Sequence, residues 1–590
     1  MNQDEDNRRL LLAAALCLGV LGLWGVMNSP PPQPMVEQSS AATTETSTGT
    51  VVSETVVPPP NERSTSEGAE GVLPEARSEQ VAPVQHRFSG TAGSGDDAVT
   101  FEVVFTNQGG ALESFVLPSY SERNAKNRPT DRPIRLADSV VDRPARERAW
   151  RQMGGLAFAE GTSFEFPVSP GYEVVDVTGT GVRYRRGNGE GIVVEREWRV
   201  DPESFLLEGA VTVRNESDQS HRYRLALGSA LKASEALLEK DGGWLQNLYP
   251  PADHLKGLCW SDGSVKRYEW KSLLEESQDF EESVQWVAVD RQYFLSALVL
   301  RDRNEATCRL TAEEDVVRSE VTLGEVSLTP GAEKRHKFTM VLGVKKPALL
   351  TVADASLESA IDYTVFGLDL AVLCAFLIWI LGWFHDLTGS WGWAIVGLTV
   401  LVKVLLFPLN QRQGKAMRAM AALKPQMDAL REKYADDRQR QNEELIKLYR
   451  SNNVNPAGGC LPLLLQMPIM FSLYRALWVS TDIYQQRFLW LSDLTVRDPY
   501  YILPILLVTS MFLQQRLMPS TMDPAQAKVM QYVLPLVFGL TLSGLPAGLC
   551  IYILVNTLLT IVQQHFINRS IGAPPDGGTE AAGAPATQAT

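Results

Sequence analysis

The residue with the most unusual setting in this sequence is a lysine inside an apolar stretch. Lys403 lies about two thirds of the way along the apolar run 391–409. On insertion scales, a lysine at the centre of a bilayer costs about 2.5–3.5 kcal/mol. In one interpretation the long stem carries the ammonium group to the membrane interface. In the other, the cation faces a wet cavity between helices and attracts acidic or polar segments.

Uncharged polar side chains in the same and other apolar runs would line such a cavity. They are Thr399, Gln466, Gln531, Asn556, Thr557 and Thr560. Each one alone is typical of a hydrogen bond between packed helices. Together with Lys403 they are consistent with an amphipathic groove. The sequence places no acidic residue in these runs, so the lysine has no ion-pair partner within them.

Motifs for catalysis or metal binding are missing from the sequence. There is no P-loop, no HExxH and no GxSxG pattern. The histidines are scattered, and the six cysteines show no paired short spacing, which excludes a disulfide scaffold and a zinc cluster. We therefore expect no enzymatic activity, no cofactor and no metal. The net charge of −14 argues against a nucleic-acid binder.

The first segments are predicted to be an anchor and a tether. The apolar run 10–27 is near the minimum length of a spanning helix and long for a signal peptide. We interpret 1–27 as an uncleaved transmembrane anchor, with a cleaved signal as the alternative; Arg8 and Arg9 predict a cytoplasmic N-terminus. Residues 28–95 are rich in Pro, Ser, Thr and Glu and are predicted to be a flexible tether.

Residues 96–345 have the pattern of antiparallel strands. Phe101, Val103 and Phe105 alternate with polar residues, and similar runs recur between Gly, Asn and Asp turns. The pattern predicts one large β-sandwich on the extracytoplasmic side, with its own core and separable from the rest. The spacing leaves open whether Cys259 and Cys308 pair there.

From residue 361 onward the sequence is that of a membrane protein. Its apolar runs are 364–384, 391–409, 459–480, 500–516, 529–545 and 547–564. Between the second and the third, residues 410–457 carry ten Lys and Arg residues, and loops rich in these residues stay in the cytoplasm. The same segment has two apolar stripes at helical spacing, and Asp436 and Asp437 can cap a second helix. We predict a cytoplasmic helical hairpin, either a docking arm for an acidic partner or a merely solvated arm.

The position of this loop constrains the topology. An outer sandwich followed by a cytoplasmic loop requires an odd number of crossings between them. We predict that 391–409 spans the membrane as helix 2 and that 361–386 lies along the outer interface, although hydropathy alone indicates that 364–384 also spans. The remaining runs then alternate as transmembrane helices 3–6 within 458–567, followed by a disordered cytoplasmic tail, 568–590.

Several short motifs resemble those of the YidC family of membrane-protein insertases. They are Asn455 to Pro462 (NPAGGCLP), Gln466 to Ile469 (QMPI), Asp498 to Pro504 (DPYYILP), Met511 to Gln515 (MFLQQ), Pro546 to Leu549 (PAGL) and Gln563 with Gln564. The resemblance is dense over 361–570. The anchor, the tether and the large outer domain are similar to the Gram-negative branch of the family.

The resemblance implies an α+β membrane protein of the bacterial inner membrane. It implies an N-terminal anchor helix, a periplasmic β-supersandwich similar to sugar mutarotases, and a five-helix transmembrane insertase core with a cytoplasmic helical hairpin. Both termini would be cytoplasmic. The family inserts and folds nascent inner-membrane proteins, alone or with the Sec translocon, and uses no nucleotide or metal.

The resemblance also implies roles for particular residues. A hydrophilic groove, closed to the outside, attracts polar substrate segments through a basic residue that is usually Arg. The candidate groove residues here are Lys403, Thr399, Gln466, Met467, Met470, Tyr552 and Asn556. The hairpin is similar to the arm that meets the ribosome and the signal-recognition-particle receptor, with Arg431, Lys433 and Arg438 as candidate contacts.

Two other functions compete with this interpretation. A secondary transporter usually shows inverted repeats around a midplane site, and the sequence shows no such repeat. A membrane-anchored periplasmic carbohydrate-binding protein would leave the membrane core unexplained. The expected partners are therefore nascent membrane proteins and the lipid bilayer, with no specific recognition of nucleic acid.

Overall fold

A computed structural model provides the fold of the second of two compact units, which begins at Val81. The residues described are 81–93, 98–124, 128–137, 152–167, 170–238, 253–281, 283–301, 305–365, 367–435, 437–452, 454, 461–517 and 529–571. The predicted anchor 1–27, most of the tether 28–95, and residues 572–590 of the predicted tail lie outside these ranges.

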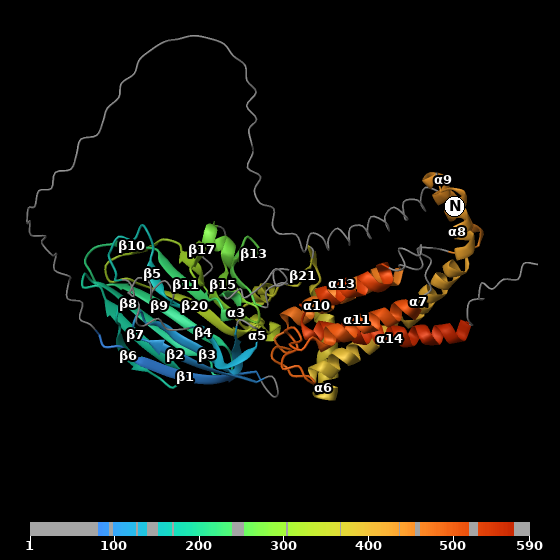
Figure 1. The fold of residues 1–590 in the computed structure, drawn as a ribbon. Coiled ribbons are helices and arrows are strands. Elements are labelled where there is room, and N and C mark those ends of the chain that lie inside the picture. Colours follow the sequence, from blue (N-terminus) through green and yellow to red (C-terminus); the bar gives the residue numbers. More distant parts are fainter. Residues whose placement is uncertain are drawn as a thin grey trace, which may run out of the picture. The chain divides into compact units, whose positions relative to one another are not determined.

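The described residues of the β domain (85–344) form three larger sheets and a two-stranded ribbon (Figure 1). The four-stranded sheet runs β1 (Gln85–Ala92), β2 (Val99–Thr106), β3 (Ala111–Arg123), β4 (Pro129–Ala137). The five-stranded sheet runs β14 (Gln278–Phe280), β17 (Ala306–Glu313), β18 (Val316–Leu323), β11 (Leu225–Lys232), β5 (Leu156–Phe158). The nine-stranded sheet runs β13 (Ser264–Glu269), β12 (Leu255–Ser261), β15 (Trp286–Arg291), β16 (Phe294–Leu300), β20 (Glu333–Val344), β9 (Leu206–Asn215), β8 (Ile192–Val200), β7 (Gly181–Gly187), β6 (Glu173–Val177). The ribbon joins β10 (His221–Tyr223) to β19 (Val326–Leu328).

Neighbouring strands in these sheets pair antiparallel, which confirms the prediction from the alternating pattern. The middle of the nine-stranded sheet is buried on both faces. Val287 and Val289 of β15 point into the main core of the domain. Trp286 and Ala288 pack instead with helix α5 (Pro347–Ala353) and the 3-10 helix η3 (Ala355–Ala360). Because both faces are covered, this strand is an unbroken apolar run rather than an alternating one.

The predicted tether ends too late in the sequence. Strand β1 lies within 28–95 and pairs with β2 along its whole length. Before it, the side-chain amide of Asn107 binds the backbone of Ala82 and Val84. The composition of this stretch is polar because β1 is the edge strand of its sheet and is half-exposed, so apolar content alone did not reveal it.

The two cysteines of the β domain lie close together as free thiols. Cys259 of β12 and Cys308 of β17 are both fully buried in the main core. Burial raises the pKa of the Cys308 thiol, and a hydrogen bond with Cys259 raises it further. In this structure the pair is reduced.

The remaining helices among the described residues are grouped in the C-terminal part of the chain, apart from two short ones in the β domain. The short ones are α3 (Glu235–Leu238) and α4 (Trp270–Glu275). The others are α6 (Ala371–Thr388), α7 (Trp391–Ala422), α8 (Lys424–Lys433), α9 (Arg438–Ser451), α10 (Leu461–Val479), α11 (Ile502–Leu517), the π-helix η5 (Val529–Val533), α13 (Leu534–Leu542) and α14 (Ala547–Ile571).

Several predicted boundaries in this part differ from the structure. The segment 361–386 is not one helix: it contains the ribbon of β21 (Thr364–Val365) and β22 (Leu368–Asp369), and α6 ends later, at the left-handed Gly389. Helix α14 extends through Ile571, so the predicted tail 568–590 begins too early. The late ends of α6 and α14 arise because hydropathy marks where apolar residues stop, whereas helices continue into polar sequence.

Helix α7 crosses the predicted boundary between transmembrane helix 2 and the hairpin. It runs without a break from Trp391 to Ala422, with Pro408 in its interior (Figure 1). Within the described residues, α6, α7 and α14 are long and apolar enough to cross a membrane by length and composition, and two shorter apolar helices are Ile502–Leu517 and Gln531–Leu542.

Candidate functional site

The lysine in the apolar part of α7 turns toward α14. Lys403 Nζ donates a hydrogen bond to Thr560 Oγ1 at 2.8 Å. The Thr560 hydroxyl in turn donates to the carbonyl of Asn556 at 2.7 Å, so its lone pair is oriented toward the ammonium group. Among the described residues Lys403 has no carboxylate partner. The side chain is thus held between two helices by a neutral acceptor, which leaves its charge uncompensated.

A second contact joins α10 to α14. Gln466 Nε2 donates to the Tyr552 hydroxyl at 2.5 Å. Tyr552 is 2% exposed, and a buried phenol requires such a partner. Two of the predicted groove residues are therefore brought together by the fold.

These contacts share one face of α14. Tyr552, Asn556, Thr560 and Gln563 follow one another at helical spacing and form a polar stripe. The Gln563 Nε2 atom is buried and has no hydrogen-bond partner among the described residues. Sequence reasoning did not select Gln563 as a site residue. The signal that would have found it is the continuation of the same spacing by one more turn.

Thr399 lies on the face of α7 that carries Lys403, one turn earlier. It is fully buried, and its hydroxyl donates to the carbonyl of Ile395 at 2.7 Å. Thr557 makes the same kind of bond within α14, where its hydroxyl donates to the carbonyl of Ile553 at 2.8 Å. Both hydroxyls are therefore satisfied within their own helices and do not contact Lys403.

The two candidate methionines follow Gln466 on α10. Met467 and Met470 are both partly buried. Met470 packs against the main apolar cluster of the helices. Flexible thioethers suit a surface that must accept different apolar partners.

One end of the helices is covered by the segment 480–501, which joins α10 to α11 and is called the cover segment here. Its Leu494 and Val496 carbonyls accept hydrogen bonds from the first amides of α14, Gly548 and Ala547, at 2.8 and 2.7 Å. Phe488 packs directly on Gly392 of α7: a Cβ there would lie 2.0 Å from the ring. The cover segment therefore belongs to the same core as the helices that carry the polar site.

The cover segment also begins α11. Asp498 accepts hydrogen bonds from the amides of Tyr500 and Leu503, at 3.0 and 2.7 Å, and from the Trp490 indole at 3.3 Å. A carboxylate in this position satisfies the free amides of a helix N-terminus.

The basic hairpin is built from α8 and α9. Asp437 accepts a hydrogen bond from the Arg440 amide, which confirms it as the cap of the second helix; Asp436 lies outside the described residues. Arg431 is partly exposed and 3.5 Å from Asp428, and Lys433 is exposed and stacks on the Tyr434 ring. Arg438 begins α9, and its side chain is outside the described part.

Within the described residues no cluster of His, Cys, Asp or Glu is arranged to hold a metal ion. The β domain does pair His254 with Asp290 at 2.8 Å, which spacing did not indicate. Asp290 also accepts a bond from the buried Lys345 at 2.6 Å. With its carboxylate shared between these two partners, Asp290 stabilises the fold of the domain.

Two family models match this chain. The one described as 60Kd inner membrane protein matches residues 383–573, and the one described as YidC periplasmic domain matches residues 97–380. A relative from Maridesulfovibrio salexigens, named Membrane protein insertase YidC, is 30% identical over 586 residues, which is 96% of this chain and 99% of the relative. A relative of the same name from Anaeromyxobacter sp. (strain Fw109-5) is 32% identical over 80% of this chain and 84% of its own.

Two solved structures are also similar to parts of this chain. A crystal structure of an active YidC insertase is 20% identical, with a TM-score of 0.33, over 80% of this chain and 93% of that chain. A galactose mutarotase-like protein from Lactobacillus casei is 12% identical, with a TM-score of 0.28, over 43% of this chain and 100% of that chain.

The arrangement is thus that of an inner-membrane protein with a β-rich periplasmic domain and apolar helices. This chain belongs to the YidC family of membrane-protein insertases.

Proposed function

We propose that this chain inserts and folds membrane proteins, and that it binds polar segments of nascent chains at the polar face shared by α7, α10 and α14. The observation that carries the proposal is the match over 96% of the chain to a relative named as an insertase. That name describes no catalysed reaction, and we assign no enzymatic activity to this chain.

The uncompensated charge of Lys403 supports this role. A polar segment that enters the membrane loses its hydration. Because the partner of Lys403 is the neutral Thr560 hydroxyl, the ammonium group can replace part of the hydration that the segment loses. An acidic segment gains most, because Coulomb attraction is stronger where water is scarce. Binding of this kind lowers the barrier for crossing without nucleotide hydrolysis.

Insertion into proteoliposomes tests the proposal. The full chain is reconstituted with a single-span substrate that has an acidic outer tail, and protected tail is measured after protease treatment. We expect Lys403→Arg to retain insertion and Lys403→Leu to lose most of it. A substrate with a neutral tail is the control and should depend less on the charge. Equal insertion by the Leu variant and the parent would show that the ammonium merely reaches the headgroups.

The finer architecture is part of the proposal. We infer an N-terminal anchor, a supersandwich-type periplasmic domain, five membrane-crossing core helices, α6 along the outer interface, and both termini in the cytoplasm. Single cysteines in a cysteine-free chain test this. An impermeant maleimide should label Gln486→Cys from outside and should spare Glu432→Cys in the hairpin. Labelling of both from outside would exclude this topology.

The partners beyond the substrate and the bilayer also remain part of the proposal. The exposed charges of α8 and α9 favour a contact with the acidic surface of the ribosome or with the signal-recognition-particle receptor. Cooperation with the Sec translocon is proposed from the family resemblance alone. Co-purification of the intact chain with ribosomes, the receptor and the translocon would test each partner separately.

A further inference from the structure

The cover segment is held on its other side by the β domain. Arg123, the last residue of β3, donates from Nη2 to Asp493 Oδ2 and to Thr495 Oγ1, both at 2.6 Å. The arginine side chain is 6% exposed and the aspartate side chain is 0% exposed. An ion pair this deeply buried is unusual, because each charge alone would be costly to remove from water.

Aromatic rings enclose this ion pair. The Arg123 guanidinium lies 4.4 Å from the centroid of the Tyr484 ring and 5.7 Å from that of Tyr293. Tyr484 comes from the cover segment, and its ring is 4.5 Å from Tyr293 and 5.6 Å from Phe294 of the β domain. Such stacking adds attraction to the cation and excludes water from it.

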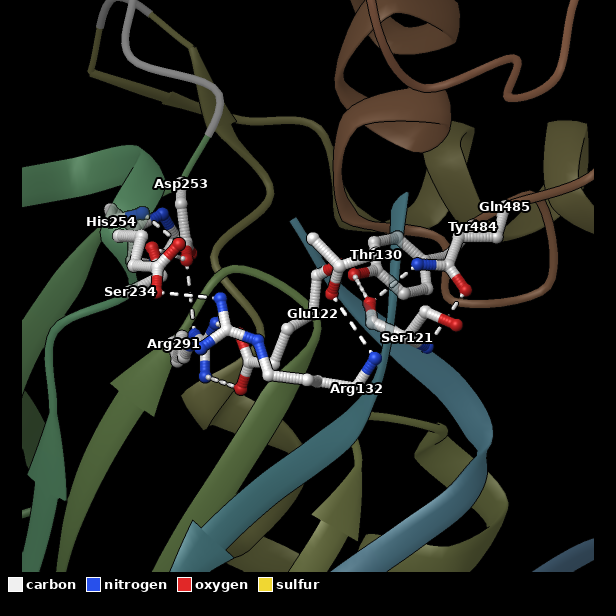
Figure 2. A network of polar contacts seen from close by, with 11 residues as sticks. Ser121, Glu122, Thr130, Arg132, Ser234, Asp253, His254, Arg291, Tyr484 and Gln485 are labelled. Carbon is white, nitrogen blue, oxygen red and sulfur yellow. Dashed lines mark hydrogen bonds and ion pairs between the residues drawn. The ribbon is translucent and has the colours of Figure 1, made fainter. Parts of the chain in front are cut away.

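A second, polar contact lies beside the ion pair. Ser121 donates its backbone amide to Gln485 Oε1 at 3.0 Å and accepts from Gln485 Nε2 at 2.6 Å (Figure 2). The glutamine side chain therefore pairs with the backbone of β3 as a neighbouring strand would. Lys346 and Asp482 add an ion pair of 2.7 Å at the edge of the contact.

The β domain holds this end of β3 in place. Glu122, between the two contact residues, makes two bonds to the Arg291 guanidinium, at 2.8 and 3.3 Å. Arg291 also donates to Asp253 at 3.0 Å, and Ser234 donates to the same carboxylate (Figure 2). Three consecutive residues of β3 thus connect alternately to the cover segment and to the interior of the β domain.

On the cover segment, Asp493 connects the contact to the local fold. Its Oδ1 atom accepts bonds from the Thr495 amide at 2.8 Å, the Thr495 hydroxyl at 2.6 Å and the Gln485 amide at 3.2 Å. The next residue, Leu494, binds the start of α14. A continuous chain of buried contacts therefore leads from β3 through Asp493 to the helix that carries the polar stripe.

We propose that the β domain acts as a clamp that keeps the cover segment seated over the ends of α7 and α14, and that Arg123 is its principal positioning residue. The inference rests on the proposed function in one respect only, namely what the clamp is for. In that respect, the seated cover segment closes the polar site on the side of the β domain. It differs from the expectation that the domain is a separable module, because removing the domain would take from the cover segment the Arg123 counter-charge of Asp493 and the backbone partner of Gln485.

A buried thiol at the start of α14 reports whether the segment is seated. Cys550 is 2% exposed and lies two residues beyond Gly548, whose amide binds the cover segment. A full-length chain with Cys550 as its sole cysteine is reconstituted in vesicles, and an impermeant maleimide is added on the side of the β domain. We expect slow labelling in the parent and at least tenfold faster labelling in Arg123→Met, which corresponds to about 1.4 kcal/mol of lost seating.

A matched variant and a double variant complete the test. Arg309→Met removes an exposed ion pair with Asp279 in the same domain and should leave labelling unchanged. In the double variant Arg123→Met with Asp493→Asn, the rate of Cys550 labelling should rise by less than the product of the two single increases. This is expected because the two side chains contact each other, so each single variant already removes the same ion pair. Additive effects, or parental labelling in a folded Arg123→Met chain, would overturn the proposal.

If Arg123→Met does not fold, the variant Gln485→Ala tests the clamp instead. It removes only the two bonds to Ser121 and should raise labelling in the same direction by a smaller factor; unchanged labelling would overturn the clamp. Because labelling is measured without substrate, a negative result leaves the proposed insertase function intact. Conversely, failure of the insertion assay leaves the clamp unaffected.

Discussion

Lys403 and Thr560 are joined across two helices, with the lysine Nζ atom 2.8 Å from the threonine hydroxyl. The hydroxyl is fixed by its own bond to the Asn556 carbonyl, so it can only accept from the lysine. The position of the ammonium group is therefore determined by α14 as well as by α7.

Replacing this acceptor should weaken the site without removing its charge. Thr560→Val keeps the side-chain shape but leaves Lys403 without its partner, and hydrogen bonds to charged groups contribute roughly 1.5–3 kcal/mol. We expect insertion of an acidic-tailed substrate to fall about tenfold, which corresponds to about 1.4 kcal/mol. Thr557→Val is the control, since that hydroxyl bonds only within its own helix. An equal loss in both variants would show a general packing effect.

The bond between Gln466 and Tyr552 should couple α10 to α14. We expect Gln466→Leu and Tyr552→Phe to destabilise the chain in detergent by less together than the sum of their separate effects. Coupling energies between membrane helices average about 0.6 kcal/mol and reach about 1.7 kcal/mol. A double-mutant cycle of unfolding free energies measures the coupling. Strictly additive losses would mean that the short contact does not stabilise the helix pair.

The β domain should lose stability in acid through Asp290. Burial alone would raise the pKa of this carboxyl. The opposing effect of Lys345 and His254 is larger, so the pKa of Asp290 in the folded chain lies well below the usual range. A lowered pKa stabilises the fold above the unfolded value of about 3.9, and this stability disappears as the pH falls toward the folded value. Asp290→Asn should therefore destabilise the chain at pH 7 and flatten the stability curve below about pH 4.

Tryptophan fluorescence in denaturant at several pH values measures this dependence. The control is Asp279→Asn, which removes an exposed pair with Arg309 and should leave the acid slope close to that of the parent. If the acid slope of Asp290→Asn were unchanged, the acid sensitivity would come from other carboxylates. Asp253 is one, because burial alone would raise its pKa but its partners, among them Arg291, lower it by more.

Charge reversal in the hairpin should affect docking and not folding. Arg431, Lys433 and Arg438 changed together to Glu should weaken binding of ribosomes to vesicles that contain the chain. Stability should change little, because exposed ion pairs such as Arg431 with Asp428 contribute at most about 1 kcal/mol.

The control reverses three exposed arginines of the β domain, Arg132, Arg309 and Arg335. Both triple variants change the net charge equally, so a difference between them isolates the position of the charges. Undiminished ribosome binding by the hairpin variant would favour a solvated arm.

Local patterns in the sequence single out individual polar residues in apolar runs, but they do not show which residue each one contacts. Residue type and family motifs indicate Lys403, Gln466 and Tyr552 as candidates, and in the structure each makes a contact between helices. The same reasoning indicates Thr399, but its hydroxyl donates to a carbonyl within α7. A polar residue in an apolar run can bond to a neighbouring helix or to a carbonyl of its own helix, and the sequence does not distinguish the two.

The contact between Arg123 and Asp493 could not be predicted in this way. The residues are separated by 370 positions, and periodicity reports which face of an element is buried but not which element covers it. Charged residues are also expected on the surface unless they are paired. The same reason applies to β15: an apolar run is typical of a buried strand but does not show the two different layers that cover it here.

Helix α7 carries both Lys403 and the beginning of the basic hairpin. Its 32 residues form a rod about 48 Å long, whereas the hydrocarbon core is about 30 Å thick. In the proposed topology the excess projects from the bilayer, so a force on the hairpin would act on a continuous helix rather than on a flexible linker. Pro408 lies between the lysine and the hairpin, where the missing amide hydrogen bond weakens the rod. If a partner docks on the hairpin as proposed, the stiffness of α7 at Pro408 sets how much of that movement reaches Lys403.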